Sequence, residues 1–467
     1  MEQTLAPGIV VLNKKYFPRD ALSAAQVGAS AFTFSVLRIL LEAKILSRVV
    51  LYSRNENITT PYYQVEQDWQ GVPVVTVYFH FRMTKSTVAQ VLSGAFEYMS
   101  SRGRNISPPI VYYQTDTLLQ YHPQGYQFCV THHGPFVSHF TEQFSSELAR
   151  LAFGGDANKV DVLEQQQRTG IRRLLQDNLG TVLAHSGLQQ RVLKDEGLAA
   201  GRFKRLRPPI GVPPLQDPAI LPQRIQKFVA SSEILLYTAV ARLDYFKNVE
   251  LLVESGLELL RRGLPVKVLI VGDPEGDDGR RQALLCSVPA DLRSHFLILP
   301  RLSKDHLYAL FAATRHNGVF LCPSRYETLG ITPLEAAAAG VTTLMTETPN
   351  VEALAFMPSL CRVAQDSRSI AARVERIHYD GVPIWAEIVE SYVRPRTSLD
   401  GFREDLLRAW ADMSKSGVRA GVATRRGAVS GSTRIRRPIL TTMVPGNSLW
   451  GMLVHSPLSP ISMGIAI

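Results

Sequence analysis

The chain has 467 residues, of which 45% are hydrophobic and 20% charged. This composition is typical of a globular protein with two or three domains. The sequence contains no apolar run long enough to span a bilayer and no basic start typical of a signal peptide. Its four cysteines lie far apart without a CxxC pair. These features argue against a membrane-spanning protein and a cysteine-based zinc site, so we expect a reduced, cytoplasmic protein.

The positive charge is concentrated at the end of the chain. Of the formal net charge of +10, seven charges belong to basic residues after Asp412, where no acidic residue follows. These residues are Lys415, Arg419, Arg425, Arg426, Arg434, Arg436 and Arg437. The pattern predicts a flexible basic tail over residues 418–467, with contact to an anionic membrane surface or partner as the alternative. Because basic and aromatic residues do not interleave, we do not expect a nucleic-acid-binding protein.

In the first part of the chain, short and nearly continuous apolar segments alternate with a helical segment. Such runs are typical of strands that are buried on both faces of a parallel sheet. The first predicted strand spans Pro7–Phe17, and the predicted helix spans Val27–Leu46. Further strands are predicted to begin near Arg48, Val72, Pro109, Tyr126 and Thr181. Ser186 follows the last strand, and we expect its side chain to cap the next helix.

A proline-rich segment separates this part from a second alternating pattern. The sequence RLRPPIGVPPLQDPAILP, which ends at Pro222, contains six prolines and predicts a linker over residues 208–222. Further strands are predicted near Glu233, Val266, His295 and Gly318, and helices over Val249–Arg262, over Asp305–Ala313 and from Ile331.

This alternation predicts an α/β protein with two doubly wound units, residues 1–207 and 223–395. Residues 396–417 are predicted to form a C-terminal helix that can cross back to the first unit. Ligands of doubly wound sheets bind at the carboxyl ends of the strands. A cleft between the two facing units is therefore the expected site.

The sequence CPSRYETLGITPLEAAAAG carries two carboxylates in an apolar setting. Glu327 and Gly330 lie in the loop after a predicted strand, and the next helix begins at Ile331 with Pro333 in its first turn. The free N–H groups and the dipole of that helix favour an anion, and Gly330 allows a close approach. Glu335 points back toward the helix start, where a carboxylate can accept hydrogen bonds from sugar hydroxyls. Alternatively, Glu335 only interacts with the helix dipole and Glu327 is solvated.

A second charged motif follows the first strand of the second unit. In VARLDYFKN, Arg242 and Lys247 are five positions apart at a strand's carboxyl end. Arginine supplies a forked donor and lysine a point charge, as a diphosphate requires. Such a pair by itself is usually a solvated surface. Together with the anion-accepting helix start, it predicts a site for a nucleotide diphosphate.

These residues together resemble those of the retaining GT-B glycosyltransferases, in particular glycosyltransferase family 4, also described as glycosyl transferases group 1. The E-x7-E motif of that family is matched by Glu327 and Glu335, and its arginine–lysine loop by Arg242 and Lys247. Further matches are LIVGD at Leu269, IGV at Ile210, LAHS at Leu183 and the paired histidines of FCVTHHGPF. The resemblance covers residues 8–369 and implies two facing Rossmann-like domains with a cleft between them.

The resemblance also implies roles for individual residues. The expected catalytic residues are His133, Glu327, Arg242 and Lys247. The expected donor-binding residues are Gly28, Arg242, Lys247, Arg301, Glu327, Leu329, Gly330, Ile331 and Glu335. Within this set, Glu335 is expected to bind the ribose, Glu327 the donor sugar, and Arg301 or its neighbour Leu302 the base.

Some positions depart from the family pattern. Ala241 replaces the glycine that usually precedes the arginine, and Val27 replaces the first residue of a double glycine whose second residue is Gly28. His132 and His133 are adjacent, so either could match the family histidine. We favour His133 and expect His132 to be a core or supporting histidine.

The implied reaction is transfer of a hexosyl group from a nucleotide diphosphate sugar, with UDP as the expected nucleotide, to an acceptor hydroxyl or amine. The anomeric configuration is retained. Because the chain has no D-x-D motif, we expect no metal and no cofactor besides the donor. The alternatives are a nucleotide-sugar epimerase on the same fold and a catalytically inactive sugar-nucleotide-binding protein.

Acceptors of this fold bind the first unit, where residues 54–70 and 80–86 are candidate loops. The first unit has no clear amphipathic basic helix, which favours a small-molecule or glycan acceptor over a lipid. The sequence carries no signal for the oligomeric state.

Overall fold

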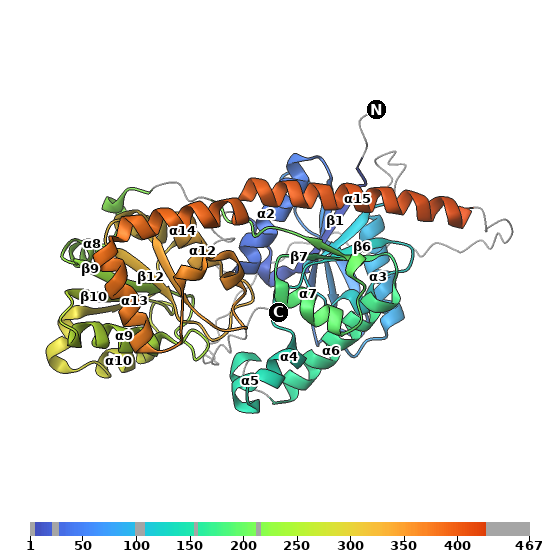
Figure 1. Ribbon diagram of the computed structural model, residues 1–467. Helices are drawn as coiled ribbons and strands as arrows, with labels where there is room; N and C mark the ends of the chain where they lie inside the picture. The colour runs from blue at the N-terminus through green and yellow to red at the C-terminus, as the bar shows by residue number, and fades with distance from the viewer. Residues whose placement is uncertain (1–4, 21–27, 99–107, 154–156, 212–215, 426–467) are drawn as a thin grey trace, which may run out of the picture.

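The computed structural model describes residues 5–20, 28–98, 108–153, 157–211 and 216–425. They form two α/β units, each built around a twisted sheet with helices on both faces (Figure 1). The predicted fold class is therefore confirmed. Among the described residues, no helix combines the length and hydropathy needed to cross a bilayer. Residues 418–425, which were predicted to begin the flexible basic tail, are helical instead, and the rest of the predicted tail lies outside the described residues.

The first unit contains an eight-stranded sheet in the order β3-β4-β2-β1-β5-β6-β7-β8. Its strands are β1 (Gly8–Asn13), β2 (Leu46–Arg54), β3 (Tyr62–Val65), β4 (Val74–Phe79), β5 (Ile110–Tyr113), β6 (Gln127–Val130), β7 (Gly180–Ala184) and β8 (Phe203–Arg205). All neighbouring strands are parallel except β3, which pairs antiparallel with β4 at the edge. The helices of this unit are α2 (Gly28–Glu42), α3 (Lys85–Glu97), α4 (Val137–Gln143), α5 (Ser146–Phe153), α6 (Ala157–Gln176) and α7 (Gly187–Asp195).

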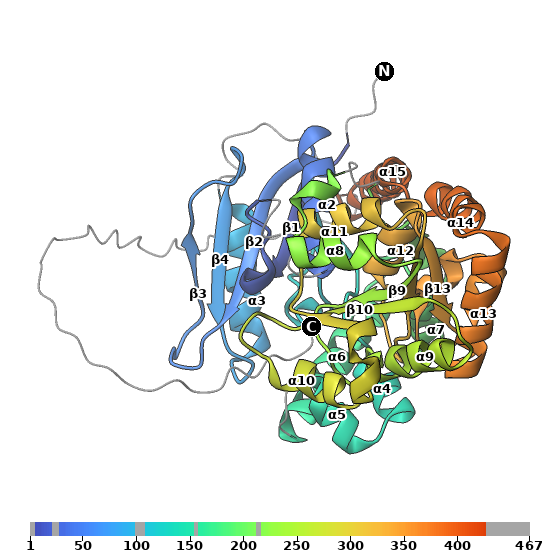
Figure 2. The ribbon, with the colours of Figure 1, turned by 90° about the vertical axis from the view of Figure 1, so that its left-hand side faces the viewer.

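The second unit contains a six-stranded parallel sheet in the order β11-β10-β9-β12-β13-β14. Its strands are β9 (Ile234–Ala239), β10 (Val266–Val271), β11 (Phe296–Leu299), β12 (Gly318–Cys322), β13 (Thr342–Thr346) and β14 (Arg362–Val363). The helices are α8 (Gln223–Ala230), α9 (Val249–Arg261), α10 (Gly279–Cys286), α11 (Lys304–Ala313), α12 (Ile331–Ala338), α13 (Ser367–Asp380) and α14 (Val382–Thr397). In Figure 2, β9 and β10 lie between α8 and α11 above and α9 and α10 below.

The strands are buried on both faces, as their unbroken apolar sequences predict. In β9, all six residues are buried, and in β1 the first five are. The strand order reverses direction between β1 and β5 in the first sheet and between β9 and β12 in the second. These two reversals are the points at which doubly wound sheets bind ligands.

A long helix, α15 (Leu399–Arg425), returns from the second unit and lies along the first (Figure 1). Phe402, Leu406 and Trp410 of α15 are fully buried in the core of the first unit. The Trp410 indole donates a hydrogen bond of 2.8 Å to the carbonyl oxygen of Ala6. The first half of α15 is thus part of the core that the first sheet forms.

Several predicted elements differ in their ends. The predicted strand Pro7–Phe17 stops at Asn13, because the Asn13 side chain accepts a hydrogen bond from the Lys15 N–H and caps a 3₁₀ turn, η1 (Lys14–Tyr16). The predicted helix over residues 27–46 begins within the described residues at Gly28 and ends at Glu42, because Lys44 adopts a left-handed conformation with φ of 58°.

The predicted linker contains a short 3₁₀ turn, and the predicted serine cap is present. Within the described part of the linker, Pro218–Ile220 form a 3₁₀ turn capped by Asp217, because proline is tolerated in a first helical turn. The Ser186 side chain accepts a hydrogen bond from the Gln189 N–H at the start of α7, so the predicted cap is confirmed.

Candidate active site

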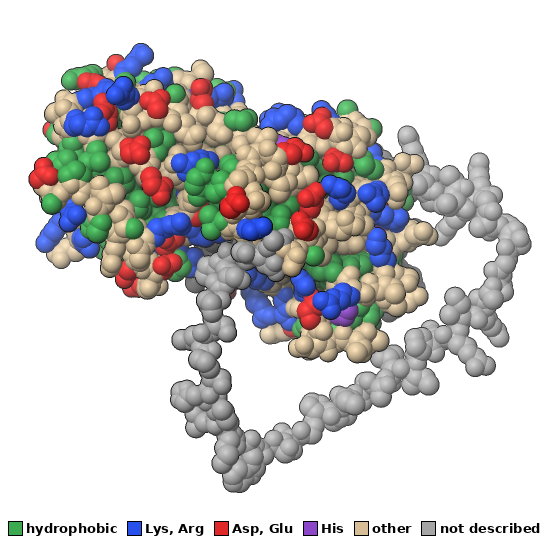
Figure 3. All heavy atoms as spheres, turned by 90° about the horizontal axis from the view of Figure 1, so that it is seen from below, with side chains coloured by type: hydrophobic (Ala, Val, Ile, Leu, Met, Phe, Trp, Pro, Cys, Tyr) green, Lys and Arg blue, Asp and Glu red, His purple; other side chains and the backbone are tan. Residues whose placement is uncertain are grey.

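A cleft of about 600 Å³ opens where the strands of the two units end. From the first unit it is lined by residues that follow β1, β6 and β7 and by the start of α2. From the second unit it is lined by the loops after β9 and β12 and the start of α12. Its volume is in the range of small-molecule sites. Seen from below, both units carry acidic and basic side chains interspersed over their surfaces (Figure 3).

The start of α12 forms part of the cleft wall. Gly330 caps this helix in a left-handed conformation, with φ of 81°, and a Cβ atom there would lie 2.9 Å from the Cβ of Ala353. Only glycine meets both conditions without strain. The turn places Leu329, Ile331 and Thr332 on the cleft, beside the N–H groups that a helix start leaves unpaired. This wall can therefore accept an anion.

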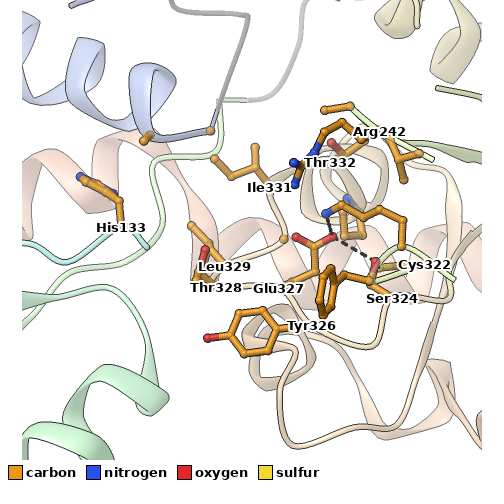
Figure 4. Close-up of a pocket in the computed structure, with 18 of the residues that line it drawn as sticks. His133, Arg242, Cys322, Ser324, Tyr326, Glu327, Thr328, Leu329, Ile331 and Thr332 are labelled. Carbon is orange, nitrogen blue, oxygen red and sulfur yellow. Dashed lines mark hydrogen bonds and ion pairs between the residues drawn. The ribbon is translucent and has the colours of Figure 1, made fainter. Parts of the chain in front are cut away.

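Lys247 and Glu327 form an ion pair on the second-unit wall. The Lys247 Nζ lies 2.5 Å from Glu327 Oε1, which also accepts a hydrogen bond of 3.0 Å from the Ser324 hydroxyl (Figure 4). Burial alone would lower the pKa of Lys247, but the charge and hydrogen bond of Glu327 outweigh it, so the pKa is raised. Lys247 therefore stays charged at neutral pH.

Arg242 lines the same wall, in a loop that a hydrogen bond to the buried Asp273 holds in place. Its guanidinium lies 3.1 Å from the carboxylate of Asp244. The Leu243 N–H donates a hydrogen bond of 2.7 Å to Asp273 Oδ1, and Asp273 is buried with φ of 61°. The sequence prediction used Asp273 only as part of a strand motif. Its left-handed conformation, which aspartate tolerates better than most residues, was not visible in the sequence.

Glu335 lies outside the cleft lining, in the first turns of α12. Its two carboxylate oxygens lie 2.6 and 2.5 Å from Lys304 Nζ, and the Tyr308 hydroxyl donates to Oε1 at 3.2 Å. Burial and the neighbouring carboxylate raise the pKa of Tyr308, so it remains a hydroxyl donor. The sequence prediction considered only the helix dipole as an alternative partner for Glu335. The ion pair was not predicted, because its partner Lys304 lies on a different helix, α11.

The two adjacent histidines point in different directions. His133 lines the cleft, opposite Glu327 and Arg242 (Figure 4). Its Nε2 lies 2.9 Å from Gln114 Oε1, and burial together with two neighbouring histidines lowers its pKa, so the ring is neutral at pH 7. His132 is buried in the interior, with Nδ1 3.0 Å from Asp116 Oδ2.

Gly28 and Arg301 also lie on the cleft, on opposite walls. A Cβ atom at Gly28 would lie 3.0 Å from the Cδ1 atom of Ile331, so the first turns of α2 and α12 approach closely across the cleft. Arg301 follows β11, and its N–H donates a hydrogen bond of 2.9 Å to the carbonyl oxygen of Asp273. All the predicted site residues except Glu335 thus line one cleft.

Sequence reasoning missed some cleft residues. His185 lies at the end of β7, and its ring is 5.7 Å from that of His133. Burial lowers the pKa of His185 to about 4. Lys15 and Tyr16 follow β1 and line the first-unit wall. Their signal was present in the sequence, because each follows a predicted strand at the carboxyl end where doubly wound sheets bind ligands.

Metal-ligating residues do not gather in the part of the chain that the structure describes: no three His, Cys, Asp or Glu side chains there are placed to hold a metal ion. The candidate ligand groups of the cleft are instead the basic side chains of Arg242, Lys247 and Arg301 and the helix start at Ile331.

Two doubly wound units that face each other across one cleft define a GT-B fold. Residues 223–379 match the protein family described as Glycosyl transferases group 1. The match includes the Arg242–Lys247 loop and the Glu327–Glu335 segment, and it covers most of the second unit.

Two curated relatives match parts of the chain. A D-inositol 3-phosphate glycosyltransferase of Gordonia bronchialis is 32% identical over 115 residues, which are 23% of this chain and 24% of that protein. A protein of Thermosipho melanesiensis, named as a probable sucrose-phosphate synthase, is 29% identical over 107 residues, which are 23% of this chain and 25% of that protein. The chain thus spans about a quarter of the length of these relatives.

Solved structures resemble nearly the whole chain. An α,α-trehalose 6-phosphate synthase of Burkholderia multivorans is 14% identical, with a TM-score of 0.60 over 92% of this chain and 100% of that chain. The Anabaena protein HepE in complex with UDP and glucose is 14% identical, with a TM-score of 0.56 over 86% of this chain and 98% of that chain. These similarities establish the GT-B fold.

Proposed function

We propose that the protein is a glycosyltransferase that transfers a hexosyl group from a nucleotide diphosphate sugar, with UDP as the nucleotide, and retains the anomeric configuration. The observation that carries the proposal is the convergence of Arg242, Lys247, Glu327 and the start of α12 on one cleft between two doubly wound units. The family match over this unit supports glycosyl transfer. The structural resemblance to a protein bound to UDP and glucose supports a UDP-sugar donor.

The positive groups of the second unit stabilise the departing diphosphate. As the bond between the sugar and the diphosphate breaks, negative charge develops on the phosphate oxygens. Arg242, Lys247 and the N–H groups at the start of α12 are held in place before this charge develops, so they need no reorganisation. Each such donor contributes about 3–4 kcal/mol to stabilisation of the transition state. The phosphate itself takes the acceptor proton in this proposal, without a metal ion.

Glu327 and His133 contact the donor sugar from opposite walls. Both hydrogen bonds that Glu327 accepts from described side chains end on Oε1, which leaves Oε2 for a sugar hydroxyl. The neutral ring of His133 can form a hydrogen bond with the sugar. It places no positive charge beside the developing oxocarbenium ion. Glu335 binds the ribose in this proposal, and for that Lys304 must share its carboxylate or move aside.

A panel of nucleotide sugars tests the proposed function. The full chain is mixed with UDP-, GDP- and ADP-sugars, and melting temperature and donor hydrolysis are measured. We expect a UDP-sugar to raise the melting temperature, because a ligand of the native state stabilises it, and to be hydrolysed slowly without an acceptor. If no nucleotide sugar alters the melting temperature or is consumed, the proposed function is wrong.

A further inference from the structure

Helix α4 of the first unit packs against two loops of the second unit, at the bottom of Figure 1. The rings of Phe140 and Phe144 meet those of Phe246 and Tyr326, and we call these four rings the aromatic bridge. The ring centroids are 5.3 Å apart for Phe140–Phe246, 5.0 Å for Phe140–Tyr326, 5.4 Å for Phe144–Phe246 and 6.0 Å for Phe144–Tyr326. These are the separations of favourable edge-to-face and tilted ring pairs.

Each second-unit ring of the bridge directly precedes a charged cleft residue. Phe246 precedes Lys247, and Tyr326 precedes Glu327. Phe246 and Tyr326 are buried, with 5% and 6% of their surface exposed, although both lie in loops. A ring that is held in place fixes the backbone to which the next residue is attached. The position of the Lys247–Glu327 pair therefore depends on where the two rings lie.

The two loops are also joined to each other. The Arg325 N–H donates a hydrogen bond of 2.8 Å to the carbonyl oxygen of Phe246. The Asn248 side chain donates one of 3.1 Å to the carbonyl oxygen of Pro323. These hydrogen bonds couple the two loops to each other. The rings of Phe140 and Phe144 pack against both coupled loops from the first unit.

Tyr326 shows that ring packing holds this position. Its hydroxyl is buried and has no hydrogen-bond partner among the described residues. A buried hydroxyl without a partner is unfavourable, so the hydroxyl does not account for the placement of the side chain. The contacts of the ring with Phe140 and Phe144 do.

We propose that Phe140 and Phe144 are positioning residues that hold the Lys247–Glu327 pair in its reactive geometry when the two units are closed. This inference rests on the proposed function. If the units separated, Phe246 and Tyr326 would lose the rings that cover them, and both loops would become freer to move. The bridge therefore couples closure of the cleft to assembly of the charged pair. Misplacement of a reacting group by about 1 Å can cost about a hundredfold in rate.

Phe144 is the residue to change. Phe140 is fully buried and also packs on Phe153 within the first unit, so its loss would disturb the α4–α5 hairpin itself. Phe144 follows the end of α4 and is only partly buried. The variants are Phe144→Ala, which removes the ring, and Phe144→Leu, which keeps apolar bulk. Phe153→Leu is the matched control, because Phe153 packs on Phe140 in the same cluster, and no second-unit ring is among its ring contacts within the described residues.

Two measurements are made on the full chain with UDP-glucose as the probe donor. The first is kcat and KM for donor hydrolysis, and the second is hydrogen exchange of peptides that cover residues 243–248 and 323–331. We expect Phe144→Ala to lower kcat about tenfold while KM changes less than about twofold, because the transition state is more sensitive to misplacement than binding is. Exchange in both loops is expected to be faster. Phe144→Leu should restore most of the kcat and most of the protection from exchange. Phe153→Leu should resemble the wild type in both measurements.

The inference is overturned if Phe144→Ala keeps wild-type kcat and exchange, or if Phe153→Leu causes the same losses. Failure of the proposed function is a different result: the wild-type chain would then turn over no nucleotide sugar at all. In that case the exchange comparison still decides the inference. Unchanged exchange in the Phe144→Ala loops would refute it, and faster exchange would show that the bridge orders both loops.

Discussion

At Glu327, one carboxylate oxygen accepts hydrogen bonds from an ammonium group and a hydroxyl, and the other oxygen is left for a ligand. This arrangement fixes the carboxylate without saturating it. The same holds for Arg242, whose guanidinium is oriented by Asp244 but retains further N–H donors. Charged groups that are partly paired by the protein are already oriented when a substrate arrives, which lowers the reorganisation needed for catalysis.

Replacement of Glu327 tests its role in catalysis. We expect Glu327→Ala to lower kcat of donor hydrolysis about a hundredfold or more, because it removes the proposed sugar contact and leaves Lys247 without its partner. Steady-state rates with the best donor of the panel provide the measurement. Glu347→Ala is the control, because Glu347 is an exposed glutamate of the same unit outside the cleft lining. Near-normal turnover of Glu327→Ala would remove this residue from the active site.

The carboxylate of Glu335 supports a separate prediction. We expect Glu335→Ala to weaken UDP binding about tenfold, because the proposed ribose contact is lost. Calorimetric titration with UDP measures the affinity. Because the change also leaves Lys304 without its partner, Lys304→Ala is the companion variant. If Lys304→Ala and Glu335→Gln, which both remove the ion pair, weaken UDP binding as much as Glu335→Ala does, the ion pair rather than a ribose contact sets the affinity. Unaltered affinity in Glu335→Ala would contradict the ribose role.

At the scale of elements, most strands could be predicted, because a strand buried on both faces needs an unbroken apolar sequence and little else. The strands β3, β8, β13 and β14 were not predicted. β3 has four exposed residues at the edge of its sheet, and β8 and β14 have only three and two residues, so none of them presents a buried apolar run. β13 is buried, but its three threonines interrupt the apolar run. The ends of β1 and α2 were also wrong, because a local asparagine cap and a left-handed lysine ended them. Such endings depend on single side-chain contacts and dihedral angles.

The start of α12 gives a prediction at this scale. We expect Gly330→Ala to lower the free energy of unfolding by about 1–3 kcal/mol, because alanine is strained at positive φ and its Cβ would crowd Ala353. UDP binding should weaken as well, since the helix start would shift. Urea unfolding and calorimetric titration measure the two effects. Gly279→Ala at the start of α10 is the control, because a Cβ there meets nothing within 4 Å. Equal stability of the two variants would show that the left-handed turn is not required.

At the scale of the whole molecule, a carboxylate of one unit caps a helix of the other. Glu352 lies in the 3₁₀ turn η7 (Glu352–Phe356) of the second unit. Its two oxygens accept hydrogen bonds of 2.7 Å from the N–H groups of Gly187 and Leu188 at the start of α7 in the first unit. Together with the aromatic bridge and α15, this contact holds the two units against each other around the cleft.

Glu352 also predicts a dependence of stability on pH. Burial raises its pKa above the usual value of 4.5, and the two backbone donors and Arg191 offset burial only in part. A group whose pKa is raised by folding stabilises the native state fully below its unfolded pKa, and this contribution is lost as the pH rises through the folded pKa. The stability of the wild type relative to Glu352→Gln should therefore be greatest near pH 4 and fall as the pH rises above 4.5.

Urea unfolding of both proteins between pH 4 and pH 7 measures this difference. Asp380→Asn, which changes a carboxylate outside the interface between the units, is the control and should not reproduce the trend. A difference between wild type and Glu352→Gln that does not change with pH would show that Glu352 has the same pKa in the folded and unfolded states.

The sequence by itself determined the two doubly wound units and the cleft positions of Arg242, Lys247, Glu327 and Gly330, because strand burial and the carboxyl ends of strands are both legible in local patterns. The family resemblance supplied Gly28, His133 and Arg301. Only the tertiary structure decided that Lys304 forms an ion pair with Glu335. It also decided that His133 rather than His132 faces the cleft, and that α4 packs on the loops that carry Lys247 and Glu327. These features join residues that are distant in sequence or differ only in side-chain direction. Local patterns carry no information on either, because such contacts exist only after the two units have packed together.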